Sequence, residues 1–105
     1  MATHYLADVR HASEHRALQR LIRLYPAEGY EQWCERQERE IARLVTHRHE
    51  VRLIEVTAAE FADYCTRTGA QRDIGVFTGF LWDTGKRLKG RIAVPAHTSD
   101  AHRNA

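Results

Sequence analysis

Histidine is the residue type in this sequence best suited to chemistry, because imidazole binds metals and exchanges protons near neutral pH. The 105-residue chain contains seven histidines. His11 and His15 lie four residues apart, a spacing that brings both rings to one face if the segment is helical. His47 and His49 flank Arg48 and would share one side of an extended segment. Together, these four histidines form a candidate metal site, with zinc as the metal that such ligands commonly bind.

The first histidine pair belongs to the string His11-Ala12-Ser13-Glu14-His15, which has the form H-x-x-E-H. The string resembles the zinc-binding motif of the inverzincin metalloproteases, in which the glutamate acts as the general base. It covers five residues of a chain far shorter than those enzymes. It also conflicts with a second interpretation, in which Ser13 caps the start of a helix. A histidine-based metal protein or enzyme is therefore our second alternative, and we expect no cofactor.

The two cysteines, Cys34 and Cys65, each fall on the apolar stripe of a predicted helix. A buried cysteine behaves as a small apolar residue, whereas a catalytic one needs an electropositive, partly exposed setting. No pattern in the sequence places a histidine base beside either thiol. The sequence therefore leans against an enzyme.

The densest basic run is Lys86–Arg91. If this segment is a strand, Arg87, Lys89 and Arg91 project from one face and could follow the phosphates of a nucleic acid. A charged outer face that keeps an edge strand soluble explains the same pattern. The net charge of +2 is small for a nucleic-acid-binding protein. A nucleic-acid-binding module that uses these three residues is our first alternative.

Length and composition indicate a small globular protein. Hydrophobic residues make up 43% of the chain and charged residues 29%, which is typical of one folded domain. No apolar run approaches the roughly 20 residues that cross a bilayer, and no secretory signal is visible. We expect a cytoplasmic protein without membrane contact. A single compact domain is predicted over residues 1–94, with a flexible tail over residues 95–105.

Apolar periodicity predicts an N-terminal helical hairpin. The first helix spans residues 13–25 and the second residues 28–46, joined by a short segment that contains Pro26 and Gly29. The apolar stripe of the second helix includes Trp33, Ile41 and Leu44. The preceding residues 5–9 either extend the first helix or form a short edge strand.

The second half predicts a strand over residues 49–56, a helix over residues 57–69 and then a β-hairpin. Thr57 and Glu60 fit a capping box at the start of this helix. The hairpin consists of residues 74–82, a turn and a return strand over residues 87–94. The predicted fold class is therefore α+β. The alternative is a mostly α fold with residues 74–88 helical. Each glycine inside that helix would cost about 1 kcal/mol of stability relative to alanine.

Many large apolar side chains belong to this small chain, including Trp33, Phe61, Tyr64, Phe77, Phe80, Leu81 and Trp82. A three-stranded sheet with helices on one side would leave the other face exposed, and monomers rarely expose a large apolar patch. A symmetric dimer is a common way to cover such a face. The sequence therefore favours a small non-catalytic interaction or regulatory protein that self-associates as a homodimer.

Overall fold

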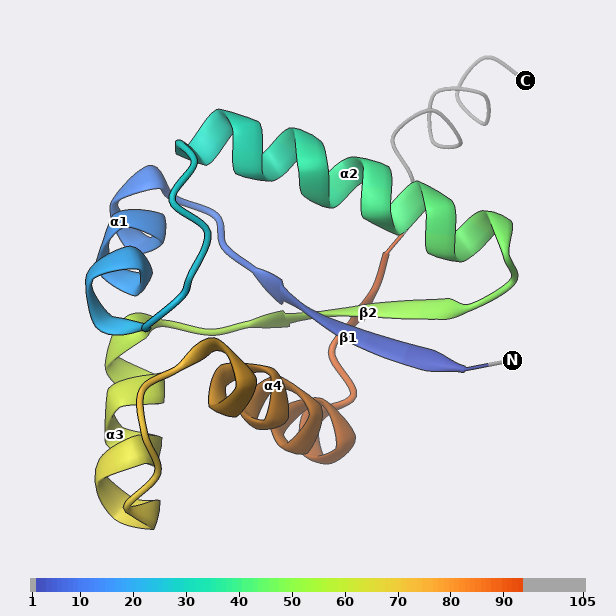
Figure 1. Cartoon of the computed structure of the whole chain (residues 1–105). Helices are drawn as coiled ribbons and strands as arrows, with labels where there is room; N and C mark the ends of the chain where they lie inside the picture. Colours follow the sequence, from blue (N-terminus) through green and yellow to red (C-terminus); the bar gives the residue numbers. More distant parts are fainter. Residues whose placement is uncertain (1, 94–105) are drawn as a thin grey trace.

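A computed structural model describes residues 2–93, which fold into four helices and a three-stranded sheet (Figure 1). In chain order the elements are β1 (Thr3–Asp8), α1 (Ala12–Leu21), α2 (Tyr30–Thr46), β2 (Glu50–Glu55), α3 (Ala58–Thr68), α4 (Ile74–Leu88) and β3 (Arg91–Ile92). The α+β class predicted from the sequence is confirmed. The predicted tail, residues 95–105, lies outside the described residues.

The sheet has the order β1-β2-β3, so β2 is its central strand. β1 runs parallel to β2, with Thr3 opposite Glu50 and Asp8 opposite Glu55. β3 pairs with β2 in the antiparallel direction. Parallel neighbours need a long crossover, and α1 and α2 supply it here. Within residues 2–93, no strand pairs with the outer edge of β1.

Helices of the same chain cover both faces of the sheet (Figure 1). α2 packs on one face against β2, and α4 packs on the other against β1 and β2. Side chains of β2 alternate between these layers, as strand geometry requires. Val51 lies in a small cluster with Ile41 and Leu44 of α2, whereas Ile54 lies in the larger core with Phe77 of α4. The apolar stripe predicted for α2 is therefore confirmed.

The β-hairpin predicted over residues 74–94 is wrong, and the helical alternative for residues 74–88 is right. The Asp73 carboxylate caps α4 by accepting a hydrogen bond from the Val76 N–H at 2.9 Å. Spacings of three and four residues bury Phe77, Phe80 and Leu81 together in the larger core. Burial on one helical face outweighs the local β propensity of this segment. Within residues 87–93 of the predicted return strand, only Arg91–Ile92 is a strand.

Of the predicted helix caps, the one at Thr57 is confirmed. The Thr57 hydroxyl accepts from the Glu60 N–H at 3.1 Å, and the Glu60 carboxylate accepts from the Thr57 N–H at 2.9 Å, forming the predicted capping box. The predicted Ser13 cap is wrong, because His11 occupies the N-cap of α1. Residues 5–9 supply most of β1, the strand that was one of the two possibilities for them.

The uncovered sheet face that favoured a dimer is not found in residues 2–93, because α2 and α4 lie on opposite faces. Three large hydrophobic side chains remain exposed in this part of the chain: Leu24, Leu88 and Ile92. No helix within residues 2–93 is both long enough and apolar enough to pass through a bilayer.

α4 approaches β1 so closely that the Tyr5 ring lies against the backbone of Gly85. A Cβ atom built on Gly85 would lie 2.1 Å from Cδ1 of Tyr5. The Trp82 ring packs edge-on against the Tyr5 ring, with the two ring centroids 5.1 Å apart. The tyrosine ring is thus held in place, and only glycine fits at position 85.

We expect Gly85→Ala to lower the free energy of unfolding by about 1–3 kcal/mol, because the added methyl group overpacks the contact with Tyr5. The matched control is Gly79→Ala in the same helix, where a Cβ would have no neighbour within 4 Å. That variant should gain up to about 1 kcal/mol of helix propensity. Denaturant melts measure both changes. Equal effects of the two substitutions would show that α4 does not pack on β1 in this way.

Candidate functional site

The four candidate metal ligands do not come together. His11 is exposed at the start of α1, whereas His15 is buried with 1% of its surface exposed. His47 is exposed just beyond α2. His49 packs edge-on against His4, with ring centroids 4.9 Å apart. Among residues 2–93, no three His, Cys, Asp or Glu side chains are placed to hold a metal ion together.

His15 is a core residue that anchors the linker between α1 and α2. Its Nε2 lies 2.9 Å from the Glu28 carbonyl, and its Nδ1 lies 3.3 Å from the Tyr25 hydroxyl. A ring with a proton on Nε2 donates to the carbonyl and accepts from the hydroxyl. The rings of Tyr25, Tyr30 and Trp33 surround it, with centroids 5.4 to 5.7 Å away. Both ring nitrogens therefore have partners in the protein.

The three basic residues proposed to contact nucleic acid do not form a strand row. Arg87 belongs to α4, Lys89 is the left-handed C-cap of that helix, and Arg91 belongs to β3. All three are exposed, and Nη2 of Arg91 lies 3.5 Å from Oδ2 of Asp8. The strand geometry that motivated this site is wrong. A role of these residues in nucleic-acid binding stays a prediction.

The two cysteines differ in their burial. Cys65 is buried in the core and Cys34 is half-buried. Burial raises the pKa of the Cys65 thiol, which disfavours the reactive thiolate. The predicted burial of the cysteines is confirmed fully for Cys65 and partly for Cys34.

The carboxyl ends of the parallel strands, where sheets of this kind often bind ligands, hold an ion-pair cluster. Nε of Arg10 lies 3.1 Å from Asp8 Oδ2, and its Nη2 lies 3.2 Å from Glu55 Oε2. The cavity beside them has a volume of about 80 Å³. Arg10 thus engages both carboxylates, and the space left is small.

A larger cavity of about 330 Å³ runs along the outer edge of β1, between α2 and α4. We call it the edge groove. It is lined by Tyr5–Ala7 of β1, Leu24–Pro26 of the linker, Trp33, Arg36 and Gln37 of α2, and Ile74, Phe77, Thr78 and Leu81 of α4. A mostly apolar lining with a few polar groups is typical of binding pockets, and the volume falls in their usual range.

The main chain of β1 presents hydrogen-bonding groups along the outer edge of the strand, which adjoins the edge groove at Tyr5–Ala7. The Glu50 N–H donates to the Ala2 carbonyl at 2.9 Å, which places Ala2 on the β2 side. Because successive residues of a strand direct these groups to opposite sides, Thr3, Tyr5 and Ala7 direct their N–H and C=O groups away from β2. These residues therefore form an outward row that another strand could join.

Two side chains close one end of this outward row. Gln37 donates from Nε2 to the Ala7 carbonyl at 2.6 Å, and the Tyr30 hydroxyl donates to the Val9 carbonyl at 2.6 Å. The same sequence stretch lacks the devices that usually protect an edge, since residues 3–7 contain no proline, lysine or acidic residue. Among residues 2–93, the edge is therefore capped at its carboxyl end and left without a strand partner along Thr3 and Tyr5.

Leu24 is held exposed beside the edge groove in a strained conformation. Its φ is 67°, in the left-handed region that disfavours a leucine, and 75% of its surface is exposed. The neighbouring Arg23 imposes this geometry, because its N–H donates to the Arg72 carbonyl at 2.7 Å and its carbonyl accepts from the Ile74 N–H at 3.0 Å. Strain at an exposed apolar side chain indicates a functional position. The sequence predicts a helix over residues 13–25 and gives no sign that Leu24 is exposed in this way.

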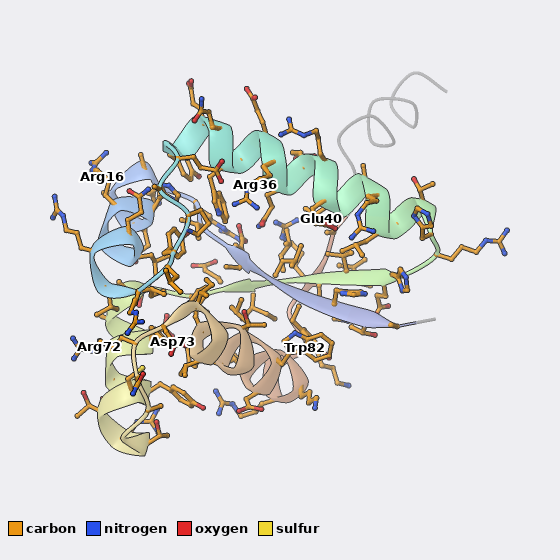
Figure 2. All side chains as sticks on the ribbon, in the orientation of Figure 1. Arg16, Arg36, Glu40, Arg72, Asp73 and Trp82 are labelled. Carbon is orange, nitrogen blue, oxygen red and sulfur yellow. The ribbon has the colours of Figure 1, made fainter. Side chains whose placement is uncertain are left out.

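One arginine of α2 lines the edge groove, and two more lie beyond it on the same helix. Arg36, Arg39 and Arg43 line a depression of about 290 Å³ with Glu40, and Arg36 also lines the edge groove. Figure 2 shows Arg36 and Glu40 on the side of α2 that faces the strands. Arg36 pairs with Glu28 at 2.6 Å, and Arg43 pairs with Glu40. Within residues 2–93, no ion pair engages Arg39.

No protein-family model, curated protein or solved structure matches this chain. The chemistry of the edge groove is therefore the basis for inferring what the protein binds.

Alkaline titration tests the burial of Tyr25, which lines the edge groove. Burial, partly opposed by Arg36, raises the pKa of Tyr25 to about 12. The unfolded phenol ionises near pH 10, so the stability that Tyr25 contributes is present below pH 10 and is lost as the pH rises toward 12. Melting temperatures measured across this window should fall more steeply for the wild type than for Tyr25→Phe. Identical slopes would contradict the burial of this hydroxyl.

Proposed function

We propose that this protein is a non-catalytic interaction domain that binds an extended segment of a partner chain at the open edge of β1. The observation that carries the proposal is the outward row of main-chain groups at Thr3 and Tyr5 beside an apolar cavity. A bound segment would pair with this row as an added strand, and its side chains would enter the edge groove. This mode of recognition obtains affinity from main-chain hydrogen bonds and specificity from side-chain pockets.

Leu24 supports the proposal independently. Its strained backbone and exposed side chain reduce the stability of the free protein, since a left-handed conformation costs a non-glycine residue about 1–2 kcal/mol. An apolar side chain that is covered only when a partner binds accounts for both features.

A second copy of the chain is one possible partner. Two β1 strands could pair in the antiparallel direction about a two-fold axis, which is the form that the predicted homodimer would take on this fold. Such a dimer would join the sheets at their edges rather than cover a sheet face.

The open edge is tested by a proline substitution and its matched control. Thr3→Pro removes an outward N–H and leaves the pairing with β2 in place, whereas Thr3→Val keeps the N–H. Peptides selected on the full chain from a library of short random sequences should bind Thr3→Pro about tenfold more weakly than the wild type, because a strand hydrogen bond is lost. Thr3→Val should bind them as the wild type does.

Leu24→Asn separates binding from folding. Asparagine tolerates the left-handed conformation, so the free energy of unfolding should stay unchanged or rise slightly while the selected peptides bind more weakly. The control is Leu88→Asn, which alters a similarly exposed leucine outside the edge groove and should leave binding unchanged. The proposal fails if no peptide is selected, or if the selected peptides bind Thr3→Pro and Leu24→Asn as tightly as the wild type.

A further inference from the structure

We infer that the segment bound at the edge groove alternates acidic and apolar residues. The inference rests on the proposed function and specifies its partner. Side chains of a strand added to β1 would point alternately toward the α2 side and the α4 side of the sheet. The two sides offer different chemistry, so the bound segment should follow the same period of two.

The α4 side of the groove is apolar. Phe77 and Leu81 are buried there, and Ile74 is half-buried. Tyr5 also lines the groove, and its ring packs edge-on against the ring of Trp82. Figure 2 shows Trp82 on α4. Side chains of the bound segment that point this way would be apolar, because burial against these residues removes apolar surface from water.

The α2 side of the groove carries a small excess of positive charge, because three arginines, Arg36, Arg39 and Arg43, lie near two carboxylates, Glu28 and Glu40. Arg36 reaches the groove itself, and Arg39 and Arg43 continue the same side of α2. Arginine binds carboxylates through two parallel hydrogen bonds, which makes an acidic side chain its natural partner. Arg39, outside every ion pair of the described residues, has its guanidinium available for such a contact.

The basic character is specific to this side of the helix. The acidic residues Glu31, Glu35 and Glu38 of α2 line neither the edge groove nor the arginine depression. The whole chain has a net charge of only +2, so the excess of arginine beside β1 is not a general property of the surface. Glu40 lies among the arginines and pairs with Arg43, and Glu28 pairs with Arg36, so Arg39 carries the net positive charge on this side of α2.

A second copy of this chain matches the pattern poorly. Paired antiparallel, the β1 strand of a second copy would direct His4, Leu6 and Asp8 toward the α2 side. Only one of the three is acidic, and Asp8 is already paired with Arg10. A segment with acidic residues at successive alternate positions would match the arginines better, which favours a different protein chain as the partner.

Fluorescence anisotropy with three labelled, end-capped peptides tests the inference on the full chain. The first peptide alternates glutamate and valine, the second alternates lysine and valine, and the third has the composition of the first with all glutamates before all valines. We expect the first to bind about tenfold more tightly than either of the others, with an affinity that falls as salt increases.

Charge reversal locates the acidic contacts. Arg39→Glu should weaken binding of the glutamate–valine peptide about fivefold and strengthen binding of the lysine–valine peptide. Arg87→Glu makes the same charge change away from both the edge groove and the arginine depression, and should alter neither affinity. Equal binding of the glutamate–valine and lysine–valine peptides would overturn the inference, and the proposed function would still hold if Thr3→Pro weakened both.

Two further outcomes are distinguishable. If none of the three peptides binds, while peptides selected from the random library bind and respond to Thr3→Pro, the inference fails and the proposed function stands. If light scattering shows a dimer whose dissociation is required before the glutamate–valine peptide binds, a second copy occupies the edge and the inference is overturned.

Discussion

The contact of the Tyr5 ring with the backbone of Gly85 is the constraint on which the rest of the structure depends. It lets α4 lie directly against β1. Without contact to this helix, β1 would be held mainly by its pairing with β2. Because α4 covers one face of β1 and β2 occupies one edge, the opposite edge remains as the open side of the strand. The same helix supplies Phe77 and Leu81 to the wall of the edge groove.

The second support of the groove is the linker between α1 and α2. Gln19 donates from Nε2 to the carbonyls of Pro26 and Glu28 at 3.0 and 2.8 Å, and His15 bonds to the same Glu28 carbonyl. Buried polar groups that are satisfied in this way hold a segment in one conformation. This linker keeps Leu24 exposed with a left-handed backbone. The conformational strain at Leu24 therefore remains beside the edge groove, where we propose that a partner binds.

Sequence patterns predicted the parts of the fold that short-range interactions decide. The capping box at Thr57 and the apolar stripe of α2 involve residues within one or two helical turns. α4 was predicted as a strand because its valine and aromatic residues favour β structure locally, and the burial that makes it a helix involves β1 and β2, far away in sequence. Gly85 is tolerated inside this helix because the Tyr5 ring occupies the space of its missing side chain.

The candidate site was harder to predict than the fold. Histidine spacing identified His11 and His15, but spacing alone does not show that His15 is buried among aromatic rings. The edge groove is assembled from β1, the linker, α2 and α4, so no single stretch of sequence contains its pattern. The nearest signal was the possibility that residues 5–9 form an edge strand.

Amide hydrogen exchange at Tyr5, followed by NMR in the free protein and with a selected peptide at saturation, tests the central claim most directly. In the free protein, the outward amide of Tyr5 should exchange much faster than the amides of His4 and Leu6, which point toward β2. Saturation with peptide should slow Tyr5 and leave the other two amides little changed. A Tyr5 amide that is already protected in the free protein, or that stays unprotected in the complex, would contradict an open edge that binds a strand.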